Sequence, residues 1–123
     1  MRILGLSFAG TATARRPEMV RFLTDVLGLA PARVEGVEAD LFELPDGSHF
    51  AVAWPGGMGD TGRSVGFLVD DLDQAVAELG QAGLAVGPTG QNERERYVHV
   101  RAPDGELYEL AERRRPVGGP GPG

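Results

Sequence analysis

Two stretches of the chain repeat apolar residues at helical spacing, and short apolar segments of strand length lie before and after each. In residues 17–28 the apolar side chains recur at steps of three and four behind Pro17, which suits a first helical turn, and Gly28 ends the pattern. In residues 71–83 Asp71 can cap a helix that Gly83 ends. The pattern predicts two amphipathic helices, and each has an apolar stripe that a sheet must cover.

The segments around the helices predict strands, because they are short apolar runs bounded by turn residues. The expected strands cover residues 2–10, 34–44 with a break near Gly36 that divides it in two, and 49–54 in the first half of the chain, and 64–69, 85–87, 97–101 and 107–111 in the second. The tripeptide Pro-Asp-Gly separates the last two strands of each half, at 45–47 and at 103–105. The sequence therefore predicts a strand, a helix and three strands, repeated once.

This internal repeat predicts the domain organisation. We expect one domain over residues 1–113, with a first module over 1–55, a linker over 56–61 and a second module over 62–113. Residues 114–123 are rich in glycine and proline and offer almost no apolar surface to bury. We expect them to form a disordered tail.

Three segments in this order resemble the vicinal oxygen chelate superfamily, which includes glyoxalase I, bleomycin-resistance proteins, fosfomycin-resistance enzymes and extradiol dioxygenases. They are residues 22–29 (FLTDVLGL), 65–72 (VGFLVDDL) and 102–110 (APDGELYEL). The resemblance implies an α+β fold of two tandem βαβββ modules, whose mixed sheet curls into an open half-barrel around a cleft, with the helices outside. It also implies that a ligand binds inside this cleft.

The resemblance further implies four cleft positions, two in each module, that hold a divalent metal in the metal-using members through His, Gln or Glu. By spacing, these positions fall on Phe8, Ala51, Ser64 and Glu109. A phenyl ring and a methyl group have no lone pair to give, and a serine hydroxyl is a poor ligand for a divalent ion. Only Glu109 suits a metal, so we expect no metal site and no cofactor.

Strand alternation adds further candidates for ligand binding in the cleft. His49 shares a strand face with Ala51, and Tyr97, His99 and Arg101 share the face that points toward Glu109. Each assignment has an alternative that stays open. His49 could be a partly exposed histidine beside a turn, and Tyr97, His99 and Arg101 could form a polar face that only water covers. Trp54 lies three residues after Ala51 and therefore points to the opposite face of the strand, so we expect it to pack against a helix or a partner chain. The predicted ligand-binding residues are Phe8, His49, Ala51, Ser64, Tyr97, His99, Arg101 and Glu109.

Charge and composition narrow the class of partner. The chain has 12 basic and 18 acidic residues, and its net charge of -6 argues against nucleic-acid binding. It has no cysteine, so disulfides and cysteine nucleophiles are excluded. The apolar run at the N-terminus is far shorter than the roughly 20 residues that span a bilayer, so we expect a cytoplasmic protein without a membrane partner. Because an open curled sheet leaves strand edges and apolar rims, we also expect a homodimer.

Three functions are compatible with these residues. The first, which we favour, is a metal-free protein of the bleomycin-resistance type that binds a small cationic or aromatic molecule. The second is a lyase-like or isomerase-like enzyme that uses Glu109 with His99, His49 or Tyr97 for proton transfer. The third is a dioxygenase-type or lyase enzyme with a displaced metal site.

Overall fold

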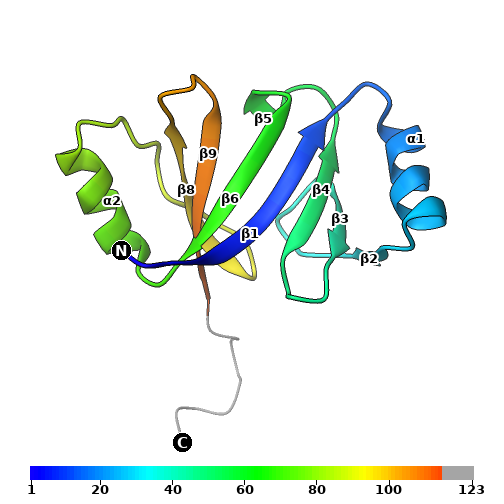
Figure 1. Cartoon of the computed structure of the whole chain (residues 1–123), viewed down its shortest axis with the longest axis horizontal. Helices are drawn as coiled ribbons and strands as arrows, with labels where there is room; N and C mark the ends of the chain where they lie inside the picture. The colour runs from blue at the N-terminus through cyan, green and yellow to red at the C-terminus, as the bar shows by residue number, and fades with distance from the viewer. Residues whose placement is uncertain (115–123) are drawn as a thin grey trace, which may run out of the picture.

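The computed structural model describes residues 1–114 and contains the predicted strand and helix units in the predicted order (Figure 1). The first half has β1 (Ile3–Ala12), α1 (Arg16–Arg21), its π-helical continuation η1 (Phe22–Val26), β2 (Ala30–Ala32), β3 (Asp40–Glu43) and β4 (His49–Ala53). The second half has β6 (Arg63–Val69), α2 (Leu72–Gln81), β7 (Gly90–Gln91), β8 (Glu95–Arg101) and β9 (Leu107–Arg113). The short strand β5 (Gly57–Asp60) lies in the linker between them.

Eight strands form one mixed sheet in the order β2-β3-β4-β1-β6-β9-β8-β7. Each module has the same internal pairing, because β1 runs parallel to β4 and β6 runs parallel to β9. The modules meet where β1 and β6 pair antiparallel, with Phe8 opposite Gly66 and Gly10 opposite Ser64. This arrangement confirms the predicted α+β fold, in which two like modules share one curled sheet.

One helix covers the outer face of each module (Figure 1). In module one Leu23 of η1 packs on Phe42 and Val52, and these three side chains are almost fully buried. In module two Leu72 and Ala75 of α2 pack on a buried cluster from three strands, which consists of Val69, Val98 and Leu110. Burial of these stripes leaves the inner face of the sheet free to form a cleft.

The signals at the helix ends act as the sequence predicts. Pro17 lies in the first turn of α1, and Gly28 follows η1 with a φ of 71°, in the left-handed region that glycine adopts without strain. The Asp71 side chain accepts a hydrogen bond of 3.0 Å from the backbone N–H of Gln74, which makes it the N-cap of α2. Gly83, with a φ of 81°, follows α2.

Several segments differ from the prediction. The strand expected over residues 34–44 forms only as β3, because the chain turns at Gly36, whose φ is 88°, and a strand, β5, forms in residues that we expected to be only a linker. In residues 85–87 only an isolated bridge forms, between Val86 and Val100, and the edge strand is instead β7, which pairs with Arg96 and Tyr97. The strand β2 was not predicted, because its three residues Ala-Pro-Ala show no alternation that would mark a strand.

Two further predictions concern a membrane span and the C-terminal tail. Among residues 1–114, no helix is long and apolar enough to cross a bilayer. Arg114, which we assigned to the tail, donates its backbone N–H to the Arg94 carbonyl oxygen at 2.7 Å. The remaining part of the predicted tail, residues 115–123, lies outside the described residues.

A cleft on the inner face of the sheet

The inner face of the curled sheet forms a cleft of about 560 Å³. Its walls come from β1, β4, β6, β8 and β9, and from two connecting segments, residues 34–39 and the linker strand β5. Seven of the eight residues proposed from the sequence line it: Phe8, His49, Ala51, Ser64, Tyr97, His99 and Glu109. That they bind a ligand stays a prediction, but the structure brings them together in one cavity.

The strand register explains why residues so far apart in sequence meet here. His49, Phe8, Gly66, Glu109 and His99 lie opposite one another on five adjacent strands, in a single row across the sheet. Since side chains opposite each other on neighbouring strands point to the same face, the whole row faces the cleft.

Glu109 is the most buried charged group of this row. Its relative exposure is 9%, and its Oε1 lies 3.3 Å from Nε2 of His99, whose ring meets Tyr97 edge to face at 5.6 Å between centroids. Within residues 1–114 the His99 ring nitrogen is the one group paired with this carboxylate, and the contact is an ion pair only when His99 is protonated. A buried carboxylate with a single such partner keeps lone pairs free, so a donor or cation from a ligand would be favoured here.

Glu95 is a second carboxylate on the same wall of the cleft, and it was not among the predicted ligand-binding residues. Burial and then the charge of Glu109 raise the pKa of Glu95 above its ordinary value, while Arg94 and Arg113 act more weakly in the opposite direction. Strand alternation could have identified Glu95, because it lies two residues before Tyr97 on the same face of β8.

His49 faces the cleft from the opposite side and is tied to a cation. Arg94 places its Nη1 3.2 Å from Nε2 of His49 and 3.4 Å from a carboxylate oxygen of Glu43. Burial, followed by the charge of Arg94, lowers the pKa of His49, so the ring is neutral at pH 7 and can accept a hydrogen bond from the guanidinium. Arg94 was missed because its partners lie far away in the sequence.

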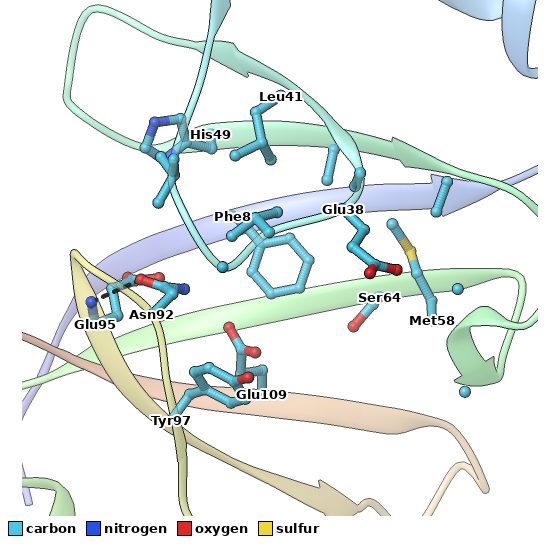
Figure 2. A pocket seen from close by; sticks show the side chains of 18 of the residues that line it. Phe8, Glu38, Leu41, His49, Met58, Ser64, Asn92, Glu95, Tyr97 and Glu109 are labelled. Carbon is cyan, nitrogen blue, oxygen red and sulfur yellow. Dashed lines mark hydrogen bonds between the residues drawn. The ribbon is translucent and has the colours of Figure 1, made fainter.

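Residues 34–39 and α1 complete the rim of the cleft. Val34, which is 7% exposed, packs with Leu41 and Ala51, and Figure 2 shows the Glu38 carboxylate pointing into the cleft near Ser64 and Met58.

At the other edge of the rim, Arg16 of α1 is bound to Asp40 at 2.7 Å, and its guanidinium carbon lies 5.6 Å from the ring centroid of Trp54. Trp54 is half exposed at this edge, and its ring lies against the Arg16 side chain of α1, in agreement with the expected packing against a helix.

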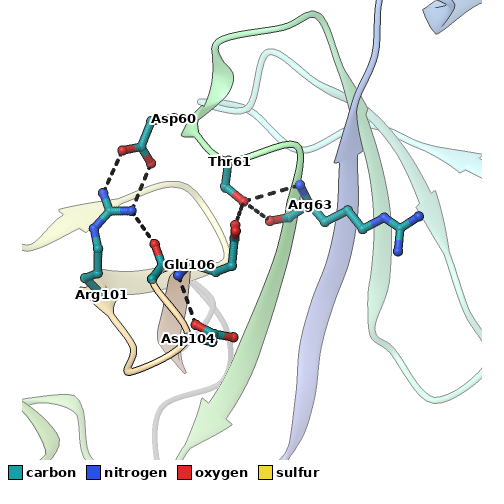
Figure 3. Close-up of polar contacts among 7 residues, drawn as sticks. Asp60, Thr61, Arg63, Arg101, Asp104 and Glu106 are labelled. Atoms are coloured by element: carbon teal, nitrogen blue, oxygen red, sulfur yellow. Dashed lines mark hydrogen bonds and ion pairs between the residues drawn. The ribbon is translucent and has the colours of Figure 1, made fainter.

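Arg101 is the one proposed site residue that does not line the cleft. Its guanidinium forms a bidentate ion pair with Asp60, at 3.1 and 2.9 Å, and also donates to the Gly105 carbonyl oxygen at 2.9 Å (Figure 3). Alternation along β8 gave the correct face, but Arg101 ends this strand where the linker passes. Asp60, which lies in the linker, therefore holds the Arg101 side chain outside the cavity.

The linker is held in place by a second polar contact. The Thr61 hydroxyl shares its one hydrogen between two acceptors, the Glu106 carboxylate and the Arg63 carbonyl oxygen, which is 2.6 Å away (Figure 3). These contacts keep Met58 of β5 over Gly10, where an added Cβ would collide with the methionine methyl group. The linker is therefore a wall of the cleft as well as a connection between modules.

The four metal-ligand positions that the sequence resemblance implies offer only two donor groups here. Phe8 and Ala51 supply no donor atom, which leaves the Ser64 hydroxyl and the Glu109 carboxylate. Among residues 1–114, no group of three His, Asp or Glu side chains is placed to hold an ion. Two donors of this kind do not make a divalent metal site.

No protein-family model and no curated protein matches the sequence, but many solved structures share the fold. The methylmalonyl-CoA epimerase of Streptomyces coelicolor, solved with 2-nitronate-propionyl-CoA, is 19% identical, with a TM-score of 0.71, and the match covers 90% of this chain and 98% of that one. A glyoxalase/bleomycin resistance protein/dioxygenase superfamily member from Vibrio splendidus is 16% identical, with a TM-score of 0.62 and coverages of 87% and 97%.

The Mn(II)-bound glyoxalase of Novosphingobium aromaticivorans is 18% identical, with a TM-score of 0.72. The match covers 89% of this chain but only 38% of that longer chain. At these identities the similarity establishes the fold, which is the one that the sequence resemblance implied, and leaves the chemistry to the residues of this cleft.

Proposed function

Because the chain has the fold of the vicinal oxygen chelate superfamily, we propose that it binds a small organic cation with an apolar or aromatic body in the cleft, without a divalent metal ion. The observation that carries the proposal is Glu109, a carboxylate nine-tenths buried at the inner wall of a cavity of about 560 Å³. A cation that displaced water from this wall would meet a carboxylate whose one partner in residues 1–114 is the His99 ring nitrogen, 3.3 Å away.

The remaining lining supports the same ligand class. The Phe8 ring forms the floor, and Val34, Leu41 and Met58 supply apolar walls. Aromatic rings attract cations through their negative faces and pack flat apolar groups well. Burial and then the charge of Glu109 raise the pKa of Glu95, so Glu109 places negative charge close to the second carboxylate of this wall. A ligand cation would relieve that repulsion.

Benzamidine and benzamide are a suitable pair of probes, because they have nearly the same shape and differ in charge. We expect benzamidine to raise the melting temperature of the protein and benzamide to leave it unchanged. A ligand at about 100 times its dissociation constant stabilises the folded state by about 2.7 kcal/mol. Glu109→Gln should remove most of the benzamidine effect.

Glu35→Gln is the matched control. This variant also removes one carboxylate charge, but Glu35 lies in residues 34–39 and its exposed side chain does not line the cleft. Equal responses to the two probes, or equal responses of the two variants to benzamidine, would contradict the proposed function.

A second candidate function rests on the distance of 3.3 Å between His99 Nε2 and Glu109 Oε1. A carboxylate beside an imidazole is a common acid-base pair, and one structural neighbour is an epimerase. If the cleft catalyses proton transfer next to a carbonyl, the chain, after treatment with a chelator, should exchange the α-hydrogen of methylmalonyl-CoA with deuterium in D2O. His99→Gln should abolish the exchange, which proton NMR measures. Absence of exchange would eliminate this candidate for that substrate.

A homodimer and a cytoplasmic location belong to the same proposal. The half-exposed apolar side chains of Ile3, Leu4 and Leu6 at the start of β1 favour an interface between two copies. The negative net charge favours a small-molecule partner over nucleic acid.

A further inference from the structure

The carboxylates that line the cleft occupy two separate places. Glu95 and Glu109 lie on the neighbouring strands β8 and β9, whereas Glu38 lies in residues 34–39, which belong to the other module. In Figure 2 the Glu38 carboxylate points into the cleft beside Ser64 and Met58, and the Phe8 ring lies between it and Glu109. An apolar floor therefore separates two acidic ends.

The arginines that line the cleft are already bound by other acidic residues. Arg16 pairs with Asp40 at 2.7 Å, and Arg94 pairs with Glu43 at 3.4 Å; neither of these acids lines the cleft. Among residues 1–114, no ion pair or hydrogen bond reaches the carboxylate of Glu38 or Glu95. Glu109 has only the His99 ring as an ion-pair partner within these residues, so the lining carries negative charge at both ends that its arginines do not pair.

A single metal ion cannot neutralise both ends. Within the described residues no three His, Asp or Glu side chains converge on one point, so one metal ion would not pair with Glu38 and with Glu95 and Glu109 together. A positive group is favoured most at Glu109, which is 9% exposed and has the His99 ring nitrogen 3.3 Å away, whereas Glu38 is exposed to water.

We infer that the ligand of this cleft is a dication, with two positive groups at opposite ends of a flat apolar body. One group pairs with Glu109 and Glu95, the body lies over Phe8, and the second group pairs with Glu38. This inference rests on the proposed function, which requires only one positive group at Glu109.

The test compares benzamidine with bis-benzamidines of several linker lengths, in which two such groups are joined. Calorimetric titration at constant ionic strength gives the dissociation constants. We expect the best bis-benzamidine to bind at least about tenfold more tightly than benzamidine, well beyond the roughly twofold gain that two equivalent ends give statistically. Glu38→Gln should remove this preference and weaken benzamidine much less than Glu109→Gln does, whereas Glu109→Gln should weaken both ligands.

Glu35→Gln again serves as the control, and it should keep the full preference for the dication. If benzamidine binds but no bis-benzamidine binds more tightly, the inference is wrong and the proposed function stands. The same conclusion follows if Glu38→Gln and Glu35→Gln behave alike. If neither ligand binds, the proposed function is overturned and the inference fails with it.

Discussion

The Phe8 ring occupies the space above Gly66 that a side chain would fill. The two residues lie opposite each other in β1 and β6, and a Cβ added to Gly66 would collide with the ring and with the Ser7 hydroxyl. Ser7 lies at an irregularity of β1, and its hydroxyl is buried without a hydrogen-bond partner in residues 1–114. The absence of a side chain at position 66 thus allows an aromatic ring to form the floor of the cleft.

Gly66→Ala should therefore destabilise the protein by about 1–3 kcal/mol, because the new methyl group overpacks the center of the sheet. Urea unfolding at pH 7 measures the change. Gly80→Ala is the control, since a Cβ at this position of α2 meets nothing within 4 Å and should stabilise the helix by about 0.4–1 kcal/mol. Equal stability of the Gly66→Ala variant and the native protein would show that the Phe8 ring is not held against Gly66.

Glu95→Gln should stabilise the protein at pH 7 and have a smaller effect at pH 4.5. Burial and the Glu109 charge raise the pKa of Glu95, so the folded state holds this proton more tightly than the unfolded chain does. The resulting penalty is fully present above the raised pKa and disappears as the pH falls through it toward the ordinary value of 4.5. Urea midpoints of the variant and native protein across this range give the difference, and a gap that widens on acidification would contradict the assignment.

Arg101→Ala should leave ligand affinity nearly unchanged, because its guanidinium is bound to Asp60 outside the cleft. The ion pair is exposed, so its coupling to Asp60 should be about 0.2–1 kcal/mol in a double-mutant cycle with Asp60→Asn. The Glu109→Gln variant provides the comparison for benzamidine binding. If Arg101→Ala lost as much benzamidine affinity as Glu109→Gln, Arg101 would have to contact the ligand and this prediction would be wrong.

Phe8→His, Ala51→Glu and Ser64→His together should create affinity for a divalent metal, since Glu109 would then complete a set of four donors around the cleft. Elemental analysis and titration with zinc or manganese measure the binding. Adding Glu109→Gln to the triple variant should weaken it. Stoichiometric metal in the native protein that is lost on Glu109→Gln would contradict the proposed metal-free cleft.

The chain should form a homodimer, with a mass in light scattering of twice the 13.0 kDa of one chain. Leu6→Glu should shift the equilibrium toward the monomer, because Leu6 is 50% exposed on β1 together with Ile3 and Leu4. Tyr108→Phe, which only removes the hydroxyl bonded to Asp104, is the control. A native mass of 13.0 kDa throughout the micromolar range would eliminate the dimer.

Much of the site was predictable because strand alternation is a local property. Parity alone places His49, Ala51, Tyr97 and His99 on the inner face, and it would have added Glu95. Parity does not say where a strand leaves the cavity, which is why it also selected Arg101. We predicted the linker as a plain connection and residues 34–39 as part of a strand, so neither Met58 nor Glu38 was expected to line the cleft.

The sequence by itself determined the repeated strand and helix units, the helix ends at Asp71, Gly28 and Gly83, and the loss of donor atoms at Phe8 and Ala51. These follow from local chemistry: a side chain that caps, a backbone that turns, and an atom without a lone pair. Only the tertiary structure decided which charges are already paired. It joined Arg16 to Asp40 and Arg94 to Glu43 and left three carboxylates facing the cleft. Pairing depends on contacts between distant segments, and these exist only once the sheet has curled.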